Sequence, residues 1–145
     1  MPSYSHILLA VDFSASTDAV AERALAMSRA FSARLSLVHI VEFVQIDLTS
    51  ELVIPQELEL DQELVDIANR RLQELGEKYG VEADACFISQ GSTKREILRI
   101  AEEQDVDLIV VGSHGREGIQ LLLGSTANAV LHGAGCDVLA VRIQD

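Results

Sequence analysis

The feature that most restricts the fold is a series of short, mainly apolar runs that recur along the whole chain. Each run spans four to seven residues, which suits a strand better than a helix. Runs of this kind are typical of strands that are buried on both faces of a parallel sheet. They lie at 7–11, 35–41, 85–88, 108–111 and 138–141.

Stretches with the period of an amphipathic helix separate these runs. The first ends near Phe31, and the others are expected over about 57–79, 93–104 and 125–131. Gly80 is placed to end the second of them in the left-handed conformation. The alternating order predicts an α/β fold of Rossmann-like type, a five-stranded parallel sheet with helices on both faces. No linker or repeat interrupts the pattern, so residues 1–145 are expected to form a single domain.

Composition narrows the classes of partner. The 145 residues are 48% hydrophobic, which is enough for a core and argues against disorder. Asp and Glu number 23 against 11 Lys and Arg, so the formal net charge is −12. Nucleic-acid binding depends on a basic surface, and nothing in this sequence resembles one. We therefore expect neither nucleic acid nor an anionic membrane surface as a partner.

The sequence also bears on compartment and redox chemistry. No basic segment precedes the first apolar run, and that run ends at Asp12, so no signal peptide is expected. No stretch approaches the ~18 apolar residues of a membrane span, which leaves a soluble, cytoplasmic protein as the expectation. Cys86 and Cys136 lack the spacing of a disulfide framework or a zinc site. They are interpreted as small buried side chains.

Parallel sheets bind ligands beyond the carboxyl ends of their strands, where the strand order reverses. The segment 112–126 leaves a buried strand, is rich in glycine and enters a helix at Ser125 and Thr126. Its backbone N–H groups, the helix dipole and the two hydroxyls would form a cradle for phosphate that needs no lysine. The alternative is a glycine-rich turn in which Ser125 or Thr126 only caps the helix.

The sequence gives less support to metal binding or catalysis than to phosphate binding. Asp12 ends the first strand and could bind a ribose hydroxyl or a metal, or cap the next helix. His114 is the histidine best placed to touch a ligand, and no histidines have the spacing of metal ligands. The Walker, dinucleotide and nucleophile-elbow glycine patterns are absent, as is an evident catalytic triad. We therefore expect no catalytic residue and no metal site.

The chain as a whole resembles the universal stress protein A family. The resemblance rests on five segments that cover the strands and the glycine-rich loop: His6–Ser14, Leu37–Val41, Asp107–Gly115, Leu123–Ala127 and Cys136–Val141. It implies the strand order 3-2-1-4-5 and a homodimer paired through the last strand, Asp137–Ile143.

Nucleotide-binding members of that family carry Gly, two residues, Gly, nine residues, then Gly-Ser or Gly-Thr. Here Gly112, Gly115 and Gly124-Ser125 match that pattern, with eight residues in the second interval instead of nine. The resemblance implies ATP or AMP as the bound ligand, and Mg²⁺ could accompany ATP. Adenine and ribose would lie beside Ala10, Val11 and Asp12, the base under Ile40 or Val41, and the ribose and phosphates on Gly112, Gly115, Gly124, Ser125 and Thr126.

The function expected from these observations is that of a cytoplasmic, dimeric stress-response regulator that binds adenine nucleotide and is not an enzyme. The alternative is a dimeric interaction scaffold that binds no nucleotide. A slow ATPase is the weakest hypothesis, because no residue is evidently positioned to activate water.

Overall fold

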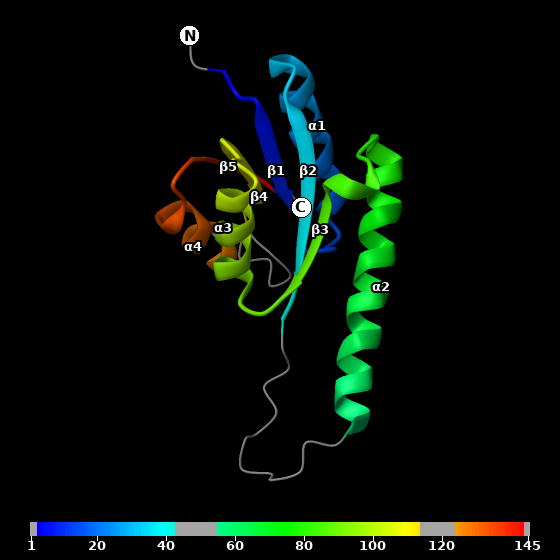
Figure 1. Ribbon diagram of the computed structural model, residues 1–145. Coiled ribbons are helices and arrows are strands. Elements are labelled where there is room, and N and C mark those ends of the chain that lie inside the picture. Colours follow the sequence, from blue (N-terminus) through cyan, green and yellow to red (C-terminus); the bar gives the residue numbers. More distant parts are fainter. Residues whose placement is uncertain (1–2, 43–54, 114–123, 144–145) are drawn as a thin grey trace.

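Strands and helices alternate along the chain, as the apolar runs predict (Figure 1). The computed structural model describes residues 3–42, 55–113 and 124–143, and of residues 55–61 only the backbone. The elements are β1 (His6–Ala10), α1 (Thr17–Phe31), β2 (Arg34–Val41), α2 (Pro55–Tyr79), the 3₁₀ turn η1 (Ala83–Ala85), β3 (Cys86–Gln90), α3 (Thr93–Glu103), β4 (Leu108–Gly112), α4 (Ser125–Gly133) and β5 (Asp137–Val141).

The five strands form one parallel sheet in the order β3-β2-β1-β4-β5, which confirms the predicted fold and strand order. β1 is the central strand. Its Leu8 pairs with Ser36 of β2 on one side and with Ile109 of β4 on the other. The strand order therefore reverses at β1, and the carboxyl ends of β1, β2 and β4 lie together at one edge of the sheet.

Helices cover both faces of the sheet (Figure 1). Alternate residues of β1 point to opposite faces, so neighbouring side chains join different clusters. Leu9 is buried in the cluster that holds Leu72 of α2, on the face covered by α1 and α2. Leu8 is buried in the cluster that holds Ile97 of α3 and Val130 of α4. Because both faces of the strand are buried, its sequence is a continuous apolar run instead of an alternation of apolar and polar residues.

Residues in the left-handed conformation follow α1, α2 and α3, the last of them Asp105 with φ 53°. Gly80 has φ +75° at the end of α2, as the sequence predicts. Ser32 has φ 53° at the end of α1, where its N–H reaches the carbonyl groups of Arg29 and Ser28. The turn η1 was not predicted, because three residues carry no periodic pattern.

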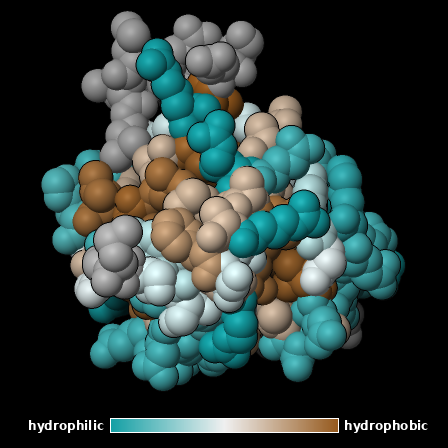
Figure 2. Space-filling model, turned by 90° about the horizontal axis from the view of Figure 1, so that it is seen from above, coloured by the Kyte–Doolittle hydropathy of each residue, from teal (hydrophilic) through white to brown (hydrophobic). Residues whose placement is uncertain are grey.

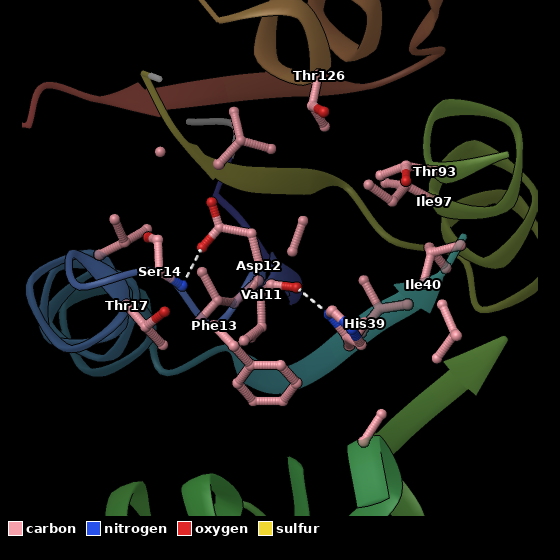
Figure 3. A pocket seen from close by; sticks show the side chains of 18 of the residues that line it. Val11, Asp12, Phe13, Ser14, Thr17, His39, Ile40, Thr93, Ile97 and Thr126 are labelled. Carbon is pink, nitrogen blue, oxygen red and sulfur yellow. Dashed lines mark hydrogen bonds between the residues drawn. The ribbon is translucent and has the colours of Figure 1, made fainter. Parts of the chain in front are cut away.

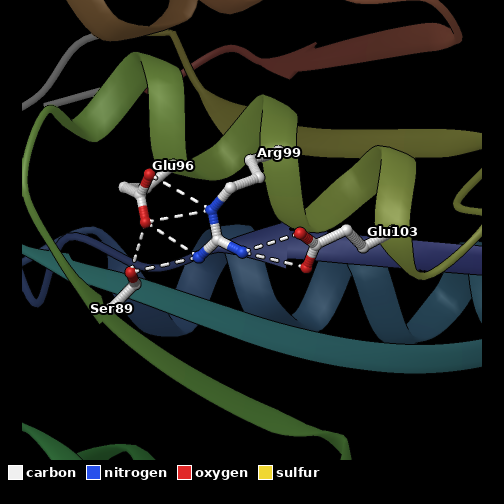
Figure 4. A network of polar contacts seen from close by, with 4 residues as sticks. All are labelled: Ser89, Glu96, Arg99 and Glu103. Carbon is white, nitrogen blue, oxygen red and sulfur yellow. Dashed lines mark hydrogen bonds and ion pairs between the residues drawn. The ribbon is translucent and has the colours of Figure 1, made fainter.

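A polar network joins the edge strand β3 to α3 (Figure 4). Ser89 donates a hydrogen bond to Glu96, and Arg99 donates to Glu96 over 2.8 Å and to Glu103 over 2.9 Å. Hydrogen bonds from Arg99 and Ser89 lower the pKa of the Glu96 carboxyl. The network lies on the surface, so its contribution to the stability of the fold is small.

The view from above shows apolar side chains gathered in the middle of this end of the molecule, with hydrophilic side chains along its right and lower sides (Figure 2). Among the helices of the described residues, none is both long enough and apolar enough to cross a membrane.

Candidate functional site

A cavity of about 570 Å³ opens at the carboxyl ends of β1, β2 and β4. This is where the strand order reverses and where the sequence predicts a ligand. The predicted site residues that line the cavity are Ala10, Val11, Asp12, Ile40, Val41, Gly112, Ser125 and Thr126. They come from three strands and one helix and are brought together only by the fold.

Three predicted residues are not in this lining. Gly124 adjoins it, because it is the N-cap residue directly before Ser125. His114 and Gly115 lie outside the described residues. Their predicted roles rest on the sequence alone.

The end of β1 forms the floor of the cavity (Figure 3). The Val11 N–H donates to the Val38 carbonyl over 2.8 Å, and the Val11 carbonyl accepts from Nδ1 of His39 over 2.6 Å. Oδ1 of Asp12 accepts the Ser14 N–H over 2.9 Å. One carboxylate oxygen of Asp12 thus fixes the turn into α1, while the side chain as a whole is exposed to the cavity mouth.

Phe13 shapes the next part of the wall. Its φ is 56°, a left-handed conformation that is unfavourable for a bulky residue. The ring lies 4.5 Å from the His39 ring, measured between centroids, and the guanidinium carbon of Arg71 lies 4.3 Å from the same Phe13 centroid. These two contacts offset the strained backbone and hold the ring at the side of the cavity.

The helices α1 and α3 each direct an amino end toward the cavity. Oγ1 of Thr17, the first residue of α1, is buried and has no hydrogen-bond partner among the described residues. At α3, Thr93 donates to the Glu42 carboxylate over 2.5 Å, and Ile97 adds an apolar surface. A buried hydroxyl without a partner is costly, so Thr17 has an unused bond to offer within this wall.

The amino end of α4 closes another side. The helix starts at Ser125 after Gly124, and no side chain makes a capping hydrogen bond. The interpretation of Ser125 or Thr126 as a simple cap is therefore not supported. Both side chains are exposed, and Figure 3 shows Thr126 on the cavity wall across from Asp12. The N–H groups of a first helical turn have no partner within the helix, and together with the helix dipole they make such an end attractive to an anion.

The helix α2 supplies a wall that the sequence did not predict. Leu64, Ile67, Ala68 and Arg71 line the cavity from one face of the helix. From helical spacing the sequence predicts that Leu64 and Ile67 face the core, but their side chains are 39% and 50% exposed. The prediction was wrong because helical spacing identifies an apolar face without showing whether a core or a cavity lies against it.

Phe13 and Ser14, which follow the first strand, and Glu42, which follows the second, also line the cavity, as the rule for the carboxyl ends of parallel strands predicts. No such signal in the sequence pointed to the lining residues Thr17, Thr93, Ile97 and Ile143. Among the described residues, no three His, Cys, Asp or Glu side chains gather as a metal site would require. Cys86 and Cys136 are partly buried beside the two cores, and burial raises the pKa of both thiols.

Known proteins resemble this chain along its full length. The model of the universal stress protein family matches residues 3–142. Universal stress protein A homolog 2 of Coxiella burnetii is 41% identical over 145 residues, covering 99% of each chain. Homolog 1 of the same organism is 38% identical over 142 residues, covering 98% of this chain and 99% of the relative. Universal stress protein A of Escherichia coli strain K12 is 27% identical over 143 residues, covering 99% of this chain and 97% of the relative.

Solved structures share the fold. The universal stress protein UspA from Lactobacillus plantarum superposes with a TM-score of 0.82 at 24% identity, covering 98% of this chain and all of that one. A universal stress protein solved in complex with cAMP superposes with a TM-score of 0.60 at 22% identity, covering 97% of this chain and 98% of that one. Family model, relatives and fold agree, and the chain belongs to the universal stress protein family.

Proposed function

We propose that this chain binds an adenine nucleotide, ATP or AMP, in the cavity beyond β1, β2 and β4, and acts as a dimeric stress-response regulator in the cytoplasm. The observation that carries the proposal is the cavity itself. Its volume of about 570 Å³ lies within the roughly 300–1,000 Å³ typical of small-molecule sites. Its walls combine apolar strand ends with polar helix ends.

The apolar and polar parts of the cavity lining can each accommodate a different part of a nucleotide. Val11 and Ile40 present buried or nearly buried apolar side chains against which a flat base can pack. The exposed Asp12 carboxylate can accept hydrogen bonds from ribose hydroxyls. The amino end of α4, with Ser125 and Thr126, can donate to phosphate oxygens.

Two further observations support the proposal. The buried Thr17 hydroxyl has no partner among the described residues, as expected for a group that a ligand or water satisfies. A universal stress protein of the same fold was solved in complex with cAMP, itself an adenine nucleotide, which supports the proposal. If Mg²⁺ accompanies ATP, phosphate oxygens and waters would supply its ligands, as is usual for this ion, and the exposed Asp12 carboxylate in the cavity lining could add one.

The dimer is proposed to form through the free edge of β5. Within the described residues β5 pairs with β4 alone, and its Val138, Leu139 and Ala140 are partly exposed. Among the described residues of the N-terminal segment, Tyr4 donates a 2.8 Å hydrogen bond from its hydroxyl to Asp137, at the start of this strand. Antiparallel pairing with a second copy would remove the open apolar edge.

Titration calorimetry with ATP and AMP tests the ligand. Replacing Ser125 and Thr126 together with Ala should weaken the binding of both nucleotides, because two donors at the α4 end are lost. Asn128→Ala is the control, since Asn128 is exposed on the same helix and outside the cavity lining. Equal weakening by the control would contradict the assignment. If the parent binds neither nucleotide at millimolar concentration, the interaction-scaffold alternative replaces the proposal.

A further inference from the structure

Ser113 connects two segments that the nucleotide and dimer proposals use separately, the end of β5 and the start of α4. It directly follows β4, and three of its hydrogen bonds reach these segments. Its N–H donates to the Val141 carbonyl over 2.8 Å, and its carbonyl accepts the Gly124 N–H over 2.5 Å. Its Oγ accepts the Ile143 N–H over 3.1 Å. One residue is therefore bonded to both segments at the same time.

Both segments reach the candidate site. Gly124 is the N-cap residue of α4, directly before Ser125 and Thr126, which line the cavity. Ile143 lies two residues beyond β5 and also lines the cavity. Ser113 itself is outside that lining. It is thus placed to hold two walls of the cavity in position without forming part of either.

The side chain of Ser113 has its own part in this junction. The ladder between β4 and β5 ends at Gly112 and Val141, so the Ile143 N–H lies beyond it. A backbone N–H outside a ladder needs another acceptor, and the Ser113 hydroxyl supplies one. Alanine at this position would remove that acceptor and leave the two main-chain bonds of the residue in place.

β5 is also the strand through which the dimer is proposed to form. Within the described residues it pairs with β4 alone, so its outer edge is open. Pairing with a second copy along that edge would restrict the strand and the residues that follow it. A phosphate on the amino end of α4 would restrict the same junction from the other side. When two binding events order one segment, the loss of conformational freedom falls on the first of them, and each event favours the other.

We propose that Ser113 is a positioning residue that couples the nucleotide site to the β5 interface, so that bound nucleotide strengthens the dimer and dimer formation strengthens nucleotide binding. The inference rests on the proposed function, because it requires both the ligand and the dimer proposed there. It adds the regulation of that site, in which the occupancy of the cavity sets the stability of the dimer. A coupling of ordinary size is about fivefold for each bound nucleotide.

Amide hydrogen exchange of β5, followed by mass spectrometry with and without saturating ATP, tests the coupling. In the parent, ATP should slow the exchange of Asp137–Val141 about fivefold. Ser113→Ala should bind ATP but lose most of this slowing, and Ser113→Thr, which keeps the hydroxyl, should retain it. Ser28→Ala is the matched control. It removes another hydroxyl bond, 2.7 Å to the Ala33 carbonyl and outside the cavity lining, and should respond as the parent does.

The dissociation constant of the dimer gives the reciprocal measurement and needs no change in β5. Sedimentation of the parent over a series of concentrations measures this constant with and without ATP. Since a dimer has two cavities, saturating ATP should lower the constant about 25-fold, the product of two fivefold factors. In Ser113→Ala the two constants should agree within about twofold.

Each other outcome overturns the inference. A parent that binds ATP as a dimer, with β5 exchange and dissociation constant unchanged, refutes the coupling and leaves the proposed function intact. A response in Ser113→Ala equal to that of the parent refutes the role of Ser113, and so does an equal loss of response in Ser28→Ala. Loss of ATP binding in Ser113→Ala shows a direct part in the site instead of coupling. A parent that binds no nucleotide, or stays monomeric at every concentration, refutes the proposed function itself and the coupling with it.

Discussion

Nε2 of the buried His6 lies 2.7 Å from Oγ of Ser36, and this bond joins the first residue of β1 to β2 at the end of the sheet away from the cavity. Nδ1 of His6 lies 2.9 Å from the carbonyl oxygen of Gln104, which can only accept. Nη2 of Arg34, which can only donate, lies 3.2 Å from the same Nδ1. The shorter contact with Gln104 favours a proton on Nδ1 in the neutral ring, with Nε2 accepting from the Ser36 hydroxyl. The neutral imidazole then bonds to both Gln104 and Ser36, and the Arg34 guanidinium beside it disfavours a second proton.

This arrangement predicts that stability falls as the pH falls through the histidine range. Burial, assisted by nearby Arg34, lowers the pKa of His6 below its ordinary value of 6.5. The unfolded chain then binds the proton more readily than the folded one, so stability is fully present above pH 6.5 and is lost as the pH drops through the lower folded value. Urea unfolding at pH 7.5 and 5.5 should show a smaller loss in His6→Gln than in the parent. Equal losses in the two proteins would contradict the assignment to His6.

Gly76 in α2 should not tolerate alanine. A Cβ built there would lie 2.8 Å from the Val81 carbonyl oxygen and 2.9 Å from Sγ of Cys86. The backbone oxygen cannot move aside easily, because the Gly76 carbonyl itself accepts the Val81 N–H over 2.7 Å. We expect Gly76→Ala to destabilise the fold by about 1–3 kcal/mol despite the helix propensity of alanine. Gly135→Ala is the control, since nothing lies within 4 Å of the added atom, and thermal unfolding of both variants measures the difference.

ATP turnover should be negligible. The sequence has no Walker lysine, and phosphoryl transfer needs a positioned nucleophile and neutralised charge. Phosphate release should match that of Gly124→Val, in which a side chain crowds the amino end of α4. The backbone at Gly124, with φ −60°, accepts valine without left-handed strain. Release from the parent that clearly exceeds this control would show an ATPase.

The β5 edge should make the protein a dimer. Light scattering at tens of micromolar should report about twice the 15.8 kDa of one chain. Leu139→Pro removes a backbone donor from the edge strand and should shift the protein to monomer. Leu131→Ala, a change to an exposed apolar residue on α4, should leave the dimer intact. A parent that scatters as a monomer would refute this mode of pairing.

The fold could be predicted from the sequence because each element carried its own local signal. The apolar run at 108–111 reads as a doubly buried strand, and Gly80 marks a helix end with a left-handed residue. The turn η1 lacked such a signal. Its three residues form one hydrogen-bonded turn between α2 and β3, which no periodicity reports.

The site was predictable only where it follows from topology. Asp12 closely follows β1 and Gly112 ends the neighbouring β4, so the rule for parallel sheets places both at the cavity. Thr93 and Glu42 are separated by 51 positions, and only the packed structure shows their contact. Arg71 was missed for the same reason, because a helix pattern does not tell which charged residue lies over a cavity.

A crystal structure of the protein grown with ATP at a concentration that saturates binding by calorimetry tests the central claim most directly. The account predicts the base against Val11 and Ile40, the ribose beside Asp12 and phosphate oxygens within hydrogen-bond distance of the α4 amino end at Ser125. Nucleotide bound at any other surface, with the cavity beyond β1, β2 and β4 unchanged, would contradict it.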